Sequence, residues 1–66
     1  MTESVRIWLT DLYENEMKEV EGTIDNERLW ADGSNTEEER EMHEGNIEEL
    51  EIYLEHLEEL LADLNE

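Results

Sequence analysis

The two histidines of this chain, set among 22 acidic residues, are the side chains whose spacing could build a metal site. Helical bundles that hold two metal ions place a glutamate three residues before a histidine. Arg40 and Tyr53 occupy those positions before His43 and His56. The acidic stretch DGSNTEEE also lacks the alternating aspartates and the twelfth-position glutamate of a calcium loop. We therefore expect no metal site and no cofactor, with one histidine at a bundle end and the other on the surface.

The hydroxyl side chains do not form the pattern of an activated nucleophile. Ser4, Ser34 and the four threonines stand in no triad-like context, and Ser34 belongs to a turn-forming stretch. Catalysis also needs a pocket that positions and desolvates its groups, and so short a chain buries only a thin core. We therefore expect no catalytic residues and a protein that is not an enzyme.

The elements that position these side chains are two long helices. In the second half, apolar residues recur at alternating spacings of three and four, which is a heptad pattern. Thr36 and Glu39 form the T-x-x-E signal of a capping box, in which Glu39 reaches back to the start of the helix. The pattern predicts a helix over about 36–65, and its apolar seam is Ile47, Leu50, Leu54, Leu57, Leu61 and Leu64.

The first half carries a second helical stripe, which predicts a helix over about 3–31. Between the two helices, residues 32–36 (DGSNT) are consecutive turn formers. The predicted fold class is all-α: one domain over 1–66, built as an antiparallel αα-hairpin with coiled-coil-like packing. The stripe of the first helix consists of Val5, Leu9, Leu12, Tyr13, Met17, Val20, Ile24 and Ala31.

A fold about Ser34 predicts which residues face each other across the hairpin. Glu27, the acid on the apolar face of the first helix, would then meet Arg40, an opposite charge. Gly22 would meet Gly45, which would either let the two backbones approach closely, let the hairpin bend, or simply be tolerated in the helices.

Each apolar stripe is wider than one neighbouring helix can cover. Two copies of the hairpin would cover both stripes as a four-helix bundle homodimer, and a different protein would do so equally well. Trp8 and Trp30 lie at the edge of the first stripe. They either close the ends of the core or act as interface anchors, a role in which tryptophan is enriched.

The formal net charge of -18 on 66 residues restricts the partners. This charge repels nucleic acid and anionic membranes, whereas it attracts cationic proteins. No apolar run is long enough for a membrane span or a signal peptide, and we expect a cytoplasmic protein. A net charge of magnitude about 2 to 8 is enough to keep a small domain soluble, so the additional negative charge needs another explanation.

Three causes compete. In the first, the chain mimics nucleic acid and occupies the basic groove of a DNA- or RNA-binding protein. The spacing of the acids favours this explanation. The second helix carries on average one acid for about every 3.5 Å of its axis, near the 3.4 Å phosphate spacing of one DNA strand. The acidic anti-restriction and anti-CRISPR inhibitors of phages and mobile elements are similar in composition and size, without a shared motif. The residues expected to stand in for phosphates are Glu37, Glu38, Glu41, Glu44, Glu48, Glu51, Glu55 and Glu58.

In the second explanation, the chain is a structural or adaptor module that docks through its apolar face, with Trp8 and Trp30 as anchors. In the third, the host is halophilic and its proteins are acidic in general. Glutamate far outnumbers aspartate, which suits helix formation better than a general hydration strategy.

Overall fold

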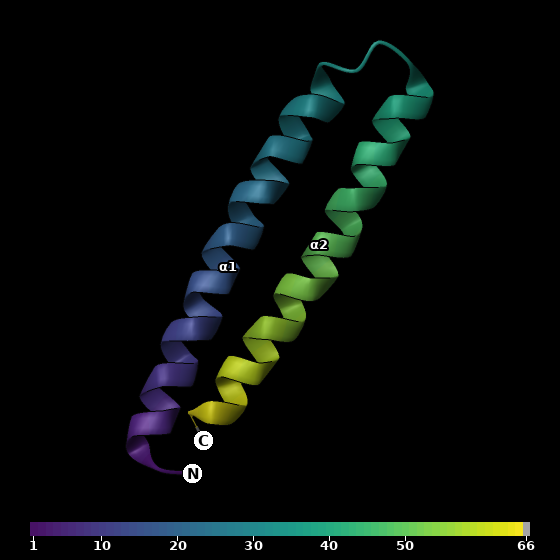
Figure 1. Ribbon diagram of the computed structural model, residues 1–66. Helices are drawn as coiled ribbons and strands as arrows, with labels where there is room; N and C mark the ends of the chain where they lie inside the picture. The colour runs from purple at the N-terminus through teal and green to yellow at the C-terminus, as the bar shows by residue number, and fades with distance from the viewer. Residues whose placement is uncertain (66) are drawn as a thin grey trace.

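The computed structural model describes residues 1–65 and consists of two helices, α1 (Glu3–Asp32) and α2 (Glu37–Leu64). The helices run antiparallel and side by side, with the start of α1 and the end of α2 at the same end of the molecule (Figure 1). The Cα atoms span 51 × 14 × 10 Å, so the hairpin is long and thin. The described residues contain no strand. The prediction of an all-α hairpin is confirmed, and each helix end lies within one residue of its expected position.

A threonine caps the start of each helix. The Thr2 hydroxyl accepts a hydrogen bond from the Val5 amide at 3.3 Å, and the Thr36 hydroxyl accepts one from the Glu39 amide at 3.1 Å. The return bond of the expected capping box differs, because the Glu39 carboxylate accepts from the amide of Asn35 at 3.4 Å rather than from Thr36. Glu39 therefore ties α2 to the loop one residue further back.

The end of α1 is closed by backbone and serine bonds. The Gly33 amide donates to Leu29 O, and the Ser34 hydroxyl donates to Trp30 O at 2.8 Å. These bonds satisfy carbonyls that a helix end leaves without partners. Because α1 ends at Asp32 and α2 starts at Glu37, the chain turns between Ser34 and Asn35.

The apolar core is a single line of side chains between the helices. Val20, Ile24 and Leu57 are buried, and no described large side chain is fully enclosed. Two helices can surround such a line on two sides only, which is why most of the seam stays half-exposed. The partly buried residues packed against this core are Tyr13, Met17, Ile47, Leu50, Leu54 and Leu60.

The register between the helices differs from the predicted one near the loop. Glu27 meets His43 rather than Arg40, because the turn lies after Ser34 and α1 extends one residue further than expected. The ion pairs within residues 1–65 do not include Arg40.

The two helix-interior glycines do not bring the backbones together. A Cβ atom built on Gly22 or Gly45 would meet no neighbouring atom within 4 Å. Helix α1 also runs without interruption through Gly22. The expectation of a close approach at this height is therefore wrong, and both glycines face open space.

Neither helix, over the residues described, has an apolar stretch of the length needed to cross a membrane.

Candidate functional site

The hairpin has two broad sides, which the contacts between the helices identify. On one side, Arg28 of α1 pairs with Glu51 of α2 at 3.1 Å. On the other side, the Tyr53 hydroxyl of α2 donates to Glu16 of α1 at 3.2 Å. Because successive helix residues are about 100° apart, Glu51 and Tyr53 point about 160° away from each other around α2. We call the side of Arg28 and Glu51 the acidic face, and the side of Tyr53 and Glu16 the aromatic face.

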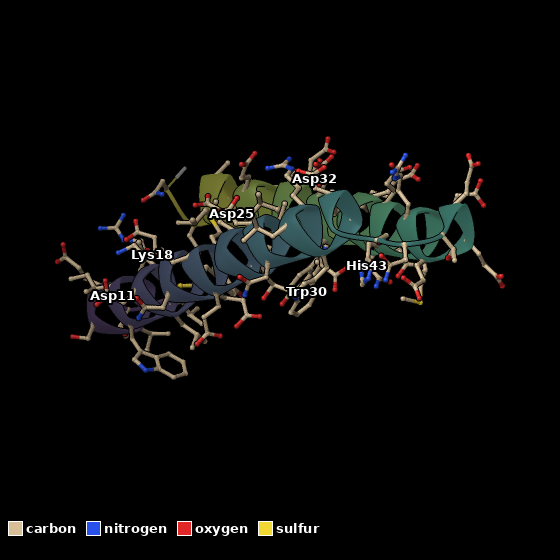
Figure 2. All side chains as sticks on the ribbon, turned by 90° about the horizontal axis from the view of Figure 1, so that it is seen from above. Asp11, Lys18, Asp25, Trp30, Asp32 and His43 are labelled. Atoms are coloured by element: carbon tan, nitrogen blue, oxygen red, sulfur yellow. The ribbon has the colours of Figure 1, made fainter. Side chains whose placement is uncertain are left out.

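Side chains in Figure 2 follow this division. Lys18, Asp25 and Asp32 lie along one side of the hairpin, whereas Trp30 and His43 lie together on the opposite side. The first three belong with Arg28, since Asp25 pairs with Arg28 at 3.7 Å. The acidic and aromatic faces therefore extend along the molecule back to back.

The eight glutamates predicted as a partner surface are all exposed. Seven of them recur at spacings of three and four along α2, which places them on the acidic face beside Glu51. Glu38 follows Glu37 directly and therefore points about 100° away, toward the other face. The acidic strip, as the structure arranges it, comprises Glu37, Glu41, Glu44, Glu48, Glu51, Glu55 and Glu58.

Arg28 neutralises part of the acidic strip at its middle. Its guanidinium bridges Asp25 of α1 and Glu51 of α2 across the helix pair. Both Arg28 and Glu51 are more than half exposed, so the pair stabilises the hairpin by at most about 1 kcal/mol. Beside them lies a shallow, open hollow of about 380 Å³, lined by Glu21, Ile24, Asp25, Arg28, Glu51 and Leu54.

The aromatic face collects most of the large apolar side chains that remain exposed. Trp8 is 62% exposed and Trp30 is 56% exposed. Both indoles are therefore more than half exposed in the single hairpin. Leu12 shares the angular position of Trp30, and Trp8 lies within about 40° of it around α1. The exposed apolar residues of this face are Val5, Trp8, Leu12, Trp30, Met42 and Tyr53.

A polar cluster lies under Trp30 at the edge of the aromatic face. The Glu27 side chain is buried, and its Oε2 lies 2.7 Å from Nδ1 of His43. The Asn46 amide donates to the same oxygen at 3.4 Å. The indole of Trp30 packs over the imidazole, with ring centroids 5.9 Å apart. An ionised carboxylate only accepts hydrogen bonds, so with Glu27 ionised the donor of this bond would be Nδ1 of His43.

Tyr53 is the residue whose ionisation the fold shifts. Packing against α1 raises the pKa of the Tyr53 phenol, because desolvation disfavours the phenolate. The neighbouring Glu16 carboxylate raises this pKa further, both by its charge and by accepting the phenolic hydrogen bond.

Within residues 1–65, no three histidine or carboxylate side chains gather into a group able to hold a metal ion. Comparison with known protein families, with curated proteins and with solved structures finds no significant match. The two faces and the Glu27 cluster therefore carry the functional argument by themselves.

Proposed function

We propose that this protein is a non-enzymatic, acidic helical protein that binds a basic, nucleic-acid-binding partner as a mimic of DNA or RNA. The observation that carries the proposal is the acidic strip, a row of seven exposed carboxylates along one side of α2. A helix holds such a row in place before any partner arrives, so little conformational entropy is lost on binding.

The charge density of the hairpin approaches that of a nucleic acid. The 21 acidic residues within 1–65 lie along a molecule 51 Å long, which is about one acid for every 2.4 Å of axis. Double-stranded DNA carries one phosphate for about every 1.7 Å. A basic groove that neutralises phosphates would therefore meet carboxylates at a density that approaches that of a nucleic acid.

Inhibition would be competitive, because the acidic strip would occupy the groove in place of the nucleic acid. Electrostatic steering would make the association fast, and salt would weaken it steeply. Such a protein would act in the cytoplasm where its target works, as anti-restriction and anti-CRISPR inhibitors do. It would not itself bind nucleic acid or an anionic membrane.

The test compares the protein with a variant in which Glu44→Gln, Glu48→Gln and Glu55→Gln are combined. These three residues belong to the strip and form no ion pair in the described chain. Each form is immobilised at about 50 mM salt, where screening is weak, and a basic protein that only the wild type retains is purified. Wild-type hairpin should then displace a labelled DNA or RNA duplex from that protein. If the retained protein binds the duplex and the hairpin at the same time, the two do not compete and the mimicry proposal is contradicted.

A second candidate function is that of a structural or adaptor module, which the aromatic face favours. Six of the exposed large apolar side chains lie on this one side. In this reading two copies pair through their aromatic faces as a four-helix bundle homodimer. Trp8→Ala or Trp30→Ala would then abolish docking, whereas neutralising the acidic strip would leave docking unchanged.

A further inference from the structure

The aromatic face has a charge pattern in addition to its apolar side chains. Trp8 and Leu12 lie toward the chain termini, and Trp30 and Met42 lie toward the loop. Tyr53 lies between them, beside Glu16. Further acidic side chains accompany Tyr53 in the middle of this face, and Glu38 adds one at the loop end. Glu19 is within about 20° of Trp30 around α1, and Glu16 is within about 40°. Glu49, four residues before Tyr53, supplies the acid from α2.

None of the four lysine and arginine residues lies on this face. Arg28 is on the acidic face with Glu51, and Lys18 lies on the same side (Figure 2). Arg40 lies eleven residues before Glu51 and therefore points within about 20° of it around α2. Arg6 lies 22 residues before Arg28 and therefore points within about 40° of it around α1. The central carboxylates of the aromatic face are therefore free of any neighbouring fixed cation in the described chain.

The Cα atoms of the hairpin span a side of 51 × 14 Å, which is a projected area of about 700 Å². A single helix of about 33 Å would cover part of this side, whereas a second copy of the hairpin would cover all of it. It would also set Glu16, Glu19 and Glu49 against their own equivalents halfway along the molecule, because the acids lie near its middle. Like charges across an interface cost free energy, so the pattern selects against self-association and in favour of a basic partner.

We infer that the aromatic face binds an amphipathic helix of another protein, with apolar residues at both ends and Lys or Arg in the centre of one face. Trp8 and Trp30 are 22 residues apart, or about 33 Å along α1, so the bound helix would span about six turns. Its apolar ends would pack on the two tryptophans, and its central cations would pair with Glu16, Glu19 and Glu49. This inference does not rest on the proposed mimicry, because the acidic strip lies on the opposite side.

A synthetic helical peptide of about 24 residues serves as the probe. It carries leucines in its first and last turns and four lysines centrally on the same face. A control peptide of identical composition places the four lysines on the opposite face. Calorimetry at about 150 mM salt, where exposed charges are well screened, measures both dissociation constants. The first peptide should bind more tightly than the control by about tenfold or more, which corresponds to about 1.4 kcal/mol.

Matched variants of the protein locate the binding face. Combining Glu16→Gln, Glu19→Gln and Glu49→Gln should weaken peptide binding about tenfold. Combining Glu44→Gln, Glu48→Gln and Glu55→Gln removes the same charge from the acidic face and should change binding far less. Circular dichroism of each variant verifies that the helices persist. Equal weakening by both triple variants, or equal affinity for the two peptides, would mean attraction by net charge alone and would overturn the inference.

Self-association is tested on the same samples. Sedimentation equilibrium should show a monomer without peptide and a 1:1 complex with it. A homodimer that Trp8→Ala dissociates, and that the peptide fails to disrupt, would show that a second copy covers the aromatic face and would also overturn the inference. Neither result depends on whether the acidic strip displaces nucleic acid, so failure here is distinguishable from failure of the mimicry proposal.

Discussion

Nδ1 of His43 lies 2.7 Å from the carboxylate of Glu27, and this bond joins α2 to α1 near the loop. Glu27 is only 9% exposed, and Asn46 donates a second hydrogen bond to the same oxygen. Every buried side-chain polar atom within the described residues has a hydrogen-bond partner. In a hairpin whose core is a single line of apolar side chains, we expect this cluster to favour one register, which leucines alone would not.

The first prediction is that His43→Ala destabilises the hairpin by about 1–3 kcal/mol. The substitution leaves a buried carboxylate without its shorter hydrogen bond, and the desolvation cost of Glu27 is then poorly compensated. Urea denaturation followed by circular dichroism gives the free energy of unfolding. His56→Ala is the matched control, because His56 is exposed and should change stability by less than about 0.5 kcal/mol. Equal losses in the two variants would show that the Glu27 bond contributes nothing.

The second prediction is that Gly22→Ala and Gly45→Ala each stabilise the protein by up to about 1 kcal/mol. Both positions lie inside a helix, where glycine costs backbone entropy, and a Cβ at either one meets no atom within 4 Å. Thermal unfolding of the single and double variants measures the gain. A loss of stability in either variant would mean that the glycine makes a contact which the open space around it does not show.

The third prediction concerns the ionisation of Tyr53. Its pKa is raised in the folded protein, first by desolvation and then by Glu16. A raised folded-state pKa stabilises the fold below the ordinary tyrosine range, and this contribution is lost as the pH rises through the folded value. Ultraviolet absorbance titration of a Tyr13→Phe variant isolates the Tyr53 phenol. Adding Glu16→Gln should lower the pKa of Tyr53 toward its ordinary value. If Glu16→Gln does not shift the titration curve of Tyr53, the pairing of Tyr53 with Glu16 is refuted.

The fourth prediction is that neutralising part of the acidic strip raises stability while weakening binding to a basic partner. Carboxylates at spacings of three and four repel each other by a few tenths of a kcal/mol per pair. Combining Glu44→Gln, Glu48→Gln and Glu55→Gln should therefore raise the midpoint of thermal unfolding at low salt. Glu51→Gln alone should give a smaller gain, because it also removes the ion pair with Arg28. A lower midpoint in the triple variant would mean that the strip stabilises the helix.

Much of the fold could be predicted from the sequence, because it depends on local signals. The heptad spacing from Ile47 to Leu64, the cap at Thr36 and the turn formers of 32–36 each determine structure within a few residues of themselves. The antiparallel pairing follows from the short loop. Exposure of the acidic strip could also be predicted, since its members avoid the apolar seam.

The cross-helix pairs could not be predicted as securely, because they depend on the register. One extra residue in α1 and a turn after Ser34 were enough to bring Glu27 to His43 instead of Arg40. A signal for this pair did exist, since Glu27 is an acid on an apolar stripe and His43 lies on the opposing seam. The exposure of Trp8 and Trp30 was equally hard to foresee. A helix edge is covered or left open according to how closely the neighbouring helix approaches, and sequence spacing does not give that distance.

Whether the hairpin presents a preformed acidic surface is best tested by circular dichroism at about 50 mM salt, with sedimentation equilibrium on the same sample. We expect high helicity, a cooperative thermal transition and a particle that keeps its size as salt is raised to about 1 M. A chain that is poorly helical at low salt, and that gains helix only with added salt or a basic partner, would contradict the claim. The acidic strip would then be assembled by its partner rather than presented to it.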